Sequence, residues 1–301
     1  MKKIIFIFST LIFLSGCTTQ TLTKQNMYNE LRNYETNKLI GPKKKLAITS
    51  FTNETRFGKR RLGQNASNIL ATELDKTNRF VLLERDKIED LMSQIALSQS
   101  GLTLGNLQNT KFLDADFIIT GAVTKYSVST QGNKNVFTQS KTQIATVAVD
   151  VRIIDAKTGK IILSESGEGE ATKEYSQVLG MGASGGYDES LEANAFRASI
   201  IKLMENIIKI LESREWSCNV VKILGNKLYL DAGGKSNLKI GTRLKIYKLG
   251  DTITDLSGMI IGNEENFIGE IIVNNHFGEN GSVAYFKGKE LLVLPLICHM
   301  P

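Results

Sequence analysis

The side chains able to do nucleophilic, acid–base or metal chemistry are few in this sequence. It holds three cysteines, Cys17, Cys218 and Cys298, and two histidines, His276 and His299. Neither histidine has a serine or cysteine partner in a recognisable motif, and His276 is expected in a turn. No HExxH, CxxC, Walker or dinucleotide-binding pattern occurs. We therefore expect no enzyme, no catalytic residue, no metal site and no cofactor.

Two further stretches offer weaker chemistry. The segment "SESGEGE" at 164–170 brings Glu165, Glu168 and Glu170 close together. Carboxylates suit hard divalent cations, so a cation site is one alternative, but side chains at a strand end more often face water and we favour that interpretation. The segment "GMGASGG" at 180–186 lacks the GxGxxG spacing and is expected to be a flexible connection.

Cys17 closes a stretch that is typical of a secretory leader. Lys2 and Lys3 precede about eleven mostly apolar residues, a run too short to span a bilayer. The following "LSGC" resembles a lipobox, at which bacterial lipoproteins are cleaved and their cysteine acylated; an ordinary cleaved leader with a chance cysteine is the alternative. Two or three acyl chains on Cys17 would anchor the protein stably. Thr18 stands where an aspartate would favour the inner membrane, so the resemblance implies an outer-membrane anchor facing the periplasm.

The other two cysteines lie at the two ends of the carboxy-terminal segment. The compartment outside the inner membrane oxidises thiols, so we predict a disulfide between Cys218 and Cys298. Closing a loop of roughly 80 residues would stabilise the fold by about 4 kcal/mol in the chain-entropy model. Two unpaired buried thiols are the alternative.

The charge balance of the mature chain is mild. Loss of residues 1–16 removes two lysines and leaves 35 basic against 31 acidic side chains. This excess favours solvated surface over contact with anionic lipid or peptidoglycan, and we expect no nucleic-acid partner. No second stretch approaches eighteen apolar residues.

Hydrophobic periodicity divides the chain into four parts. After a leader at 1–16 and a polar, lipidated tether at 17–42, we expect an α+β domain at 43–213 and a small β domain at 215–301. The α+β domain is expected to be a mixed sheet with packed helices, and the last part a small barrel or sandwich. Strands are predicted at 79–84, 117–128 and 144–155, and in the last of these the apolar residues from Ala145 to Ile153 alternate with the residues between them. Asn78 is expected to end a helix in the left-handed conformation, and Gly159 to take a positive φ in a hairpin turn. Helices are predicted from Asp86, around 104–113 and from Asp188, and one more is predicted by the apolar stripe Leu62, Ala66, Ile69, Leu70 and Leu74. The helix from Asp188 carries a wide apolar stripe, which the sheet or a neighbouring subunit must cover; its members are Ile200, Leu203, Met204, Ile207 and Leu211.

Several stretches resemble the CsgG/HfaB family, which includes the curli secretion lipoprotein. They are "KKLAITSFTNET", "NASNILATEL", "RFVLLERDKIEDLMSQ", "LDADFIITGAVTKY" and "VAVDVRIIDAKTGKIILSES". The resemblance covers roughly 43–213 and implies an α+β periplasmic domain and a ring of subunits. In the curli member, two hairpins per subunit leave this domain and build an outer-membrane pore.

The resemblance stops at those hairpins. They would fall in "STQGNKNVFTQSKTQ", which we expect to be a connection, and in "TKEYSQVLGMGASGGYD". Neither shows the sustained alternation of apolar residues that lipid-facing strands need. The loop that narrows the curli channel corresponds to "RFGKRRLGQN", which lacks the aromatic gate. The carboxy-terminal part resembles the last domain of flagellar assembly protein T, which implies contact with proteins.

These observations favour a lipid-anchored envelope lipoprotein that acts as a scaffold or ring component in assembly or secretion-related transport. Homo-oligomers are expected, with an envelope or secreted protein partner of unknown identity. Two alternatives stay open: an oligomeric outer-membrane secretion pore for extracellular fibre subunits, and a monomeric regulatory or binding lipoprotein.

Overall fold

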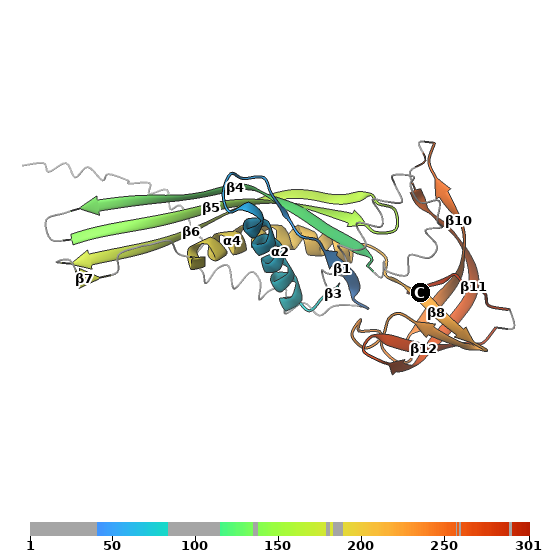
Figure 1. The fold of residues 1–301 in the computed structure, drawn as a ribbon. Coiled ribbons are helices and arrows are strands. Elements are labelled where there is room, and N and C mark those ends of the chain that lie inside the picture. Colours follow the sequence, from blue (N-terminus) through green and yellow to red (C-terminus); the bar gives the residue numbers. More distant parts are fainter. Residues whose placement is uncertain are drawn as a thin grey trace, which may run out of the picture.

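The chain is a mixed α/β protein, mostly sheet, with two described helices (Figure 1). A computed structural model describes residues 41–83, 115–134, 138–178, 181–182, 189–256, 258, 260–288 and 291–301. Within these residues the strands form two separate sheets, one before and one after residue 213. The predicted domain bounds stay a prediction, but each sheet has its own hydrophobic core.

The first sheet has the strand order β3-β1-β4-β5-β6-β7, with β2 beside β4. Its strands are β1 Lys44–Ile48, β2 Thr52–Asn53, β3 Phe80–Leu83, β4 Phe117–Lys134, β5 Thr138–Asp155, β6 Ile161–Val178 and β7 Met181–Gly182. β1 runs parallel to β3 and β4, whereas β4, β5 and β6 form an antiparallel meander. The sheet is therefore mixed, as the α+β prediction requires.

Two helices cover one face of this sheet, α2 Lys59–Lys76 and α4 Glu189–Glu212. The alternating residues of β5 bury their side chains beneath them, and so do the predicted helix stripes. The fully buried members are Ala145, Val147, Val149, Ile153, Leu62, Ala66, Leu70, Leu74, Ile200, Met204, Ile207 and Leu211. The predicted alternation of β5 and the apolar face of each helix are thus confirmed.

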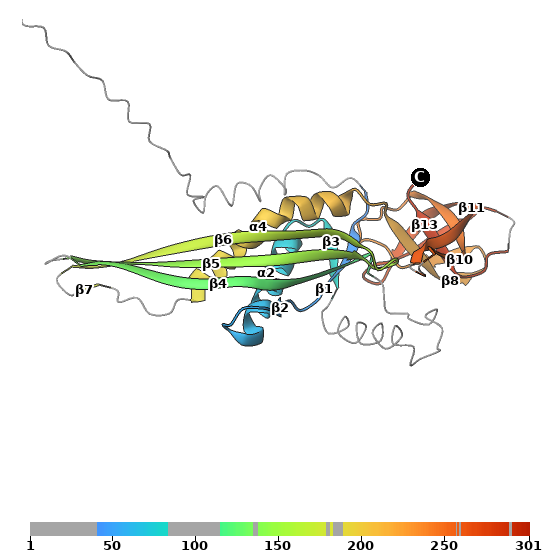
Figure 2. The same cartoon turned by 90° about the horizontal axis from the view of Figure 1, so that it is seen from above.

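Helix α4 runs along β6 at unusually close range (Figure 2). A Cβ atom added at Gly169 would lie 2.1 Å from the Ser199 nitrogen and 2.4 Å from the Ala195 oxygen. Ser199 also donates its hydroxyl to the Gly167 carbonyl, at 2.7 Å. The two glycines in "SGEGE" therefore let the helix backbone rest on the strand.

The three meander strands are each 18 residues long. At about 3.3 Å per residue they reach about 60 Å, and their far ends project beyond the helices (Figure 1). The predicted ends at residue 128 and residue 144 were wrong, because β4 continues to Lys134 and β5 begins at Thr138. The second segment, expected to lack strand alternation, likewise carries the end of β6 and the short β7. Backbone pairing extends these strands without an apolar face.

The second sheet is a closed barrel with the order β10-β11-β12-β9-β8-β13. Its strands are β8 Ser217–Leu224, β9 Lys227–Leu230, β10 Arg243–Thr254, β11 Ile260–Phe277, β12 Gly281–Phe286 and β13 Leu296–His299. Its interior holds fully buried apolar side chains such as Leu228, Leu244 and Ile271. The barrel alternative is thus the observed one, and the described residues after 213 include no helix.

Local predictions had mixed outcomes. Asn78 and Gly159 have positive φ values of 53° and 70°, as their turns require. His276 lies in β11 and not in a turn, and its Nε2 is 2.7 Å from the Leu238 carbonyl oxygen. The helices expected from Asp86 and around 104–113, and the start at Asp188, lie outside the described residues.

Candidate assembly site

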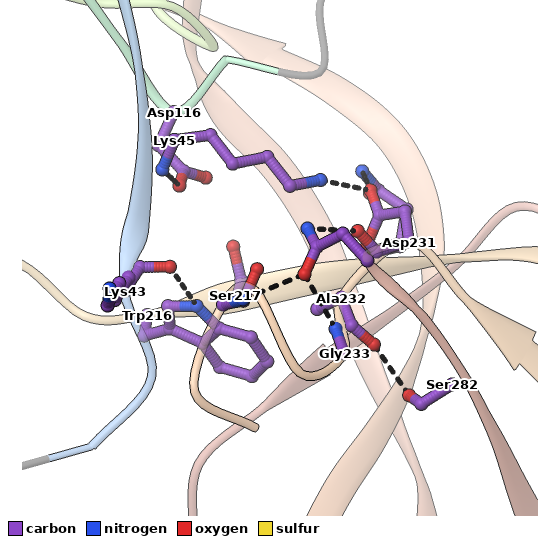
Figure 3. A network of polar contacts seen from close by, with 12 residues as sticks. Lys43, Lys45, Asp116, Trp216, Ser217, Asp231, Ala232, Gly233 and Ser282 are labelled. Atoms are coloured by element: carbon purple, nitrogen blue, oxygen red, sulfur yellow. Dashed lines mark hydrogen bonds and ion pairs between the residues drawn. The ribbon is translucent and has the colours of Figure 1, made fainter. Parts of the chain in front are cut away.

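The predicted anchor, Cys17, lies outside the described residues, so its acylation stays a prediction. The described chain begins at Gly41, whose carbonyl accepts a hydrogen bond from Asn237 Nδ2 at 3.1 Å. Lys43 then donates its N–H to the Ser236 carbonyl at 2.7 Å and accepts from Trp216 Nε1 at 3.2 Å (Figure 3). The tether therefore leaves the protein at the joint between sheet and barrel. In the described part of the chain, no helix has the length and apolar character needed to cross a membrane.

A buried ion pair holds the same joint together (Figure 3). Lys45 Nζ from β1 lies 3.1 Å from Asp231 Oδ2, which follows β9, and the two side chains are only 9% and 8% exposed. Asp231 also accepts hydrogen bonds from the backbone N–H and side-chain amide of Asn219, at 2.8 and 2.9 Å. Because the lysine and the amide donors share its oxygens, the buried carboxylate is well satisfied.

A second carboxylate lies beside this pair. Asp116, just before β4, accepts the Lys45 backbone N–H at 2.8 Å. Burial raises the pKa of Asp116, although this hydrogen bond and the nearby Lys157 and Lys45 act in the opposite direction. The joint thus contains two acidic groups: Asp231, which pairs with Lys45, and Asp116, whose ionised form is disfavoured by burial. The ion pair fixes the barrel to the start of the sheet.

The far ends of β4, β5 and β6 form a segment that we call the extension, here residues 124–132, 141–147 and 168–175. It lies at the opposite end of the sheet from the barrel (Figure 1). Its helix-side face continues past Tyr126 with Val128, Ala145 and Ala171 and then with Thr130, Gly132, Lys141, Gln143, Lys173 and Tyr175. Its other face carries Ile144 among Lys125, Ser127, Ser129, Gln131, Thr142, Thr146, Glu168, Glu170, Thr172 and Glu174. Polar side chains thus occupy both faces.

Among the described residues, no strand pairs with the two outer edges of the extension over much of their length. β1 and β2 accompany β4 only as far as Val123, whose carbonyl accepts the Glu54 N–H at 3.0 Å. No described strand pairs with that side of β4 over Ser127 to Gln131. On the other edge, β7 pairs with β6 only at Gln177 and Val178. Such edges are templates for strands from another chain.

The base of the extension is braced by a buried carboxylate. Glu192 of α4 is 3% exposed and accepts hydrogen bonds from both terminal nitrogens of Arg61, at 2.9 and 3.0 Å. Asn65 Nδ2 and the Tyr126 hydroxyl complete its shell at 3.1 and 2.9 Å. One glutamate therefore ties α2, α4 and β4 together, and Arg61 in the first turn of α2 supplies the partly exposed cation that pairs with it.

Cys218 and Cys298 lie directly opposite each other on β8 and β13, where the barrel closes. Both are buried free thiols. Burial raises the pKa of Cys218 well above its ordinary value, and the neighbouring Cys298 adds to that shift. The disulfide stays a prediction, with partners that the register places side by side.

The remaining candidate groups do not converge on a site. Glu165 accepts a hydrogen bond from Asn206 of α4 at 2.8 Å, whereas Glu168 pairs with Lys125 on the opposite face at 2.7 Å. The described residues include no group of three histidine, cysteine, aspartate or glutamate side chains placed to bind a metal. His299 Nε2 lies 3.0 Å from Glu265 Oε2 at the barrel surface.

Sequence reasoning missed the open edges and the joint. The extension is rich in serine, threonine and glutamine, which the search for apolar alternation passes over. Lys45 and Asp231 belong to different sheets, and no local pattern pairs them. The single tryptophan, Trp216, at the start of the barrel was the one available signal of a contact at this boundary.

Comparison with known proteins identifies the class. A Neisseria meningitidis serogroup B protein named "Putative lipoprotein NMB1126/NMB1164" is 27% identical over 218 residues, which cover 69% of this chain and 93% of that protein. The family model "Curli production assembly/transport component CsgG" matches residues 24–233, more than two thirds of the chain. This is an envelope-associated lipoprotein, of a family that is described as an assembly/transport component. The chain belongs to the CsgG family.

Solved structures show similarity of fold alone. Lipoprotein GNA1162 from Neisseria meningitidis is 15% identical, with 55% of this chain and 98% of that chain covered and a TM-score of 0.31. The PelC dodecamer from Paraburkholderia phytofirmans is 19% identical, with 58% and 92% covered and a TM-score of 0.30. At these scores neither structure carries an argument about this chain. The resemblance of the barrel to flagellar assembly protein T stays a prediction.

Proposed function

We propose that this chain is a lipid-anchored outer-membrane lipoprotein that faces the periplasm and assembles with copies of itself. Its role is that of a scaffold or ring component in assembly or secretion-related transport. The observation that supports this most is the extension, a three-stranded projection with polar faces and open edges. Such an element is suited to pairing with other strands in water.

The side chains of the extension favour an aqueous setting. A strand that faces lipid alternates apolar residues over about nine to eleven positions. Along β4 the helix-side face loses its apolar character after Val128, and the opposite face of β6 carries Glu168, Glu170 and Glu174. Burying these carboxylates in hydrocarbon would cost several kcal/mol, so the extension is expected to project into the periplasm.

The position of the tether agrees with this orientation. From Cys17 to Gly41 the sequence runs about 24 residues, and a flexible coil of that length would span about 27 Å on average. Gly41 lies at the joint, about 60 Å of strand from the free end of the extension (Figure 1). The acylated end therefore favours a joint close to the membrane and an extension that reaches away from it.

The secretion pore remains a second candidate because the two segments that could hold pore hairpins do contain strands. Vesicle flotation and planar bilayers separate the two. The acylated protein should float with lipid vesicles, whereas residues 18–301 should stay folded in the aqueous fraction and carry no current across a planar bilayer. If residues 18–301 insert and conduct ions, the scaffold proposal is wrong.

A further inference from the structure

We propose that copies of this chain join by parallel strand addition, with the outer edge of β4 in one copy against the outer edge of β6 in the next. This inference rests on the proposed self-assembly and names the surface that performs it. β4 and β6 are both antiparallel to β5, so they run in the same direction. A second copy placed edge to edge therefore extends the sheet without changing its orientation.

The backbone groups on the two edges match. The Val123 carbonyl points away from β5, because it accepts the Glu54 N–H. A bulge between Val123 and Lys125 shifts the ladder by one residue, so beyond it the even-numbered residues, such as Val128 and Thr130, turn their N–H groups outward. On β6 the outward groups are also at even positions, since the Glu168 carbonyl accepts the Lys202 ammonium of α4 at 2.6 Å.

In a parallel ladder, an outward residue on one strand bonds the two outward residues that flank its partner. The backbone groups of Val128 and Thr130 in one copy would thus form hydrogen bonds with even-numbered residues of β6 in the next copy. The residues of β6 that lie directly beside Val128 and Thr130 are then odd-numbered. Side chains at even positions of β4 and at odd positions of β6 both lie on the helix side. The two faces of the sheet are therefore preserved across the contact.

Charge fixes which edges meet and in which register. Lys125, Ala148 and Glu168 form one row across the meander, and Lys125 Nζ reaches over Ala148 to Glu168 Oε1 at 2.7 Å. An unshifted repeat places Lys125 beside Glu168 of the neighbouring copy, with Glu170 one diagonal step away. Opposite charges at such positions stabilise strand pairing. Two β6 edges would bring their carboxylates together, so like edges repel.

A contact between unlike edges is heterologous. Each copy keeps one free β4 edge and one free β6 edge after the first contact, so addition continues until the array closes into a ring or grows as a filament. The exposed Lys202 side chain of α4 donates a hydrogen bond to the Glu168 carbonyl in the single chain, and the strand of a neighbouring copy would replace this donor.

Charge reversal and mixing test the contact in residues 18–301 by sedimentation velocity at low ionic strength. Lys125→Glu and Glu168→Lys should each raise the dissociation midpoint about tenfold, because each puts like charges across the interface. An equimolar mixture of the two variants should recover assembly, since every mixed interface then holds opposite charges. Lys235→Glu, an equal charge change on an exposed barrel residue, should have no effect.

Cross-linking provides the second measurement. Residues 125 and 168 of one chain are two strands apart, about 9.6 Å, which is too far for a disulfide within the chain. The double variant Lys125→Cys, Glu168→Cys should therefore form disulfides between chains only, seen as a ladder on non-reducing gels. Lys125→Cys with Glu174→Cys, about 20 Å out of register, should not.

The outcomes are distinguishable. Monomeric wild-type protein at all concentrations would overturn the self-assembly proposal, and this inference with it. Oligomers of the wild-type protein with an unchanged dissociation midpoint in both charge-reversal variants, or a mixture of the two variants that stays dissociated, would overturn the strand-addition contact. Either result would leave the scaffold proposal standing. Cross-links in the out-of-register pair would overturn the assigned register.

Discussion

Replacing Lys45 by methionine should lower the free energy of unfolding by about 3–5 kcal/mol. The change removes the ammonium group that lies 3.1 Å from Asp231, and that carboxylate, 8% exposed, loses its ion-pair partner. The methionine keeps most of the apolar stem of the lysine, so packing loss is a small part of the effect. The cost is that of a buried charge without its partner.

A double-mutant cycle isolates the pair. Asp231→Asn alone should also destabilise, because it removes the charge that pairs with the buried Lys45 ammonium. The double variant should cost about 2–3 kcal/mol less than the sum of the two single changes. The exposed pair Lys235 and Glu279, 3.8 Å apart and 57% and 91% exposed, is the control, and its coupling should stay below about 1 kcal/mol.

The fluorescence of the single tryptophan reads this joint directly. Trp216 is 7% exposed and donates its indole N–H to the Lys43 carbonyl, two residues from Lys45. Urea unfolding followed at this residue gives the free energies for all four proteins of the cycle. If Lys45→Met lowers the free energy of unfolding by less than about 1 kcal/mol, or if the two changes are strictly additive in the cycle, the buried ion pair does not stabilise the joint and the reasoning is refuted.

Three other results are expected. Asp116→Asn should stabilise the protein at pH 7, since the raised pKa makes the ionised carboxyl unfavourable in the fold. Urea midpoints should show that this gain shrinks as the pH falls through the raised pKa towards the ordinary value of 3.8. A difference in urea midpoint that does not depend on pH would contradict this prediction. Gly169→Ala should destabilise by about 1–3 kcal/mol or more, because the new methyl meets the backbone of α4, whereas Gly262→Ala has open space and should change the urea midpoint little. We propose that an oxidised glutathione buffer converts the Cys218 and Cys298 thiols of unfolded chain to one disulfide during refolding, with two glutathione thiols released; intact-mass measurement showing two free thiols in the oxidised product would contradict this.

Much of the fold could be predicted because burial and backbone periodicity agree in its core. Val147, Val149 and Val151 of β5 alternate with the small or polar residues Ala148, Asp150 and Arg152, and the helix-covered face of the sheet buries the three valines almost completely. The stripe on α4 likewise predicted an apolar face that had to be covered, and the sheet covers it. These elements carry their packing in their own local sequence.

The candidate site could not be predicted because it depends on pairing between distant residues. Ser127 and Ser129 form strand by hydrogen bonding to β5, which their polar side chains do not signal. The register that sets Cys218 against Cys298 is likewise a property of barrel closure and not of their spacing. The lipid anchor is the opposite case, because the short "LSGC" segment predicts it without any fold.

The central claim is that this body assembles with itself in water and that lipid only holds it at the envelope. Sedimentation equilibrium of residues 18–301 in detergent-free buffer tests this claim most directly. A defined mass that is an integer multiple of the chain mass, reached at micromolar concentration, is the predicted result. A single-chain mass throughout, or assembly that occurs only when detergent or lipid is present, would contradict it.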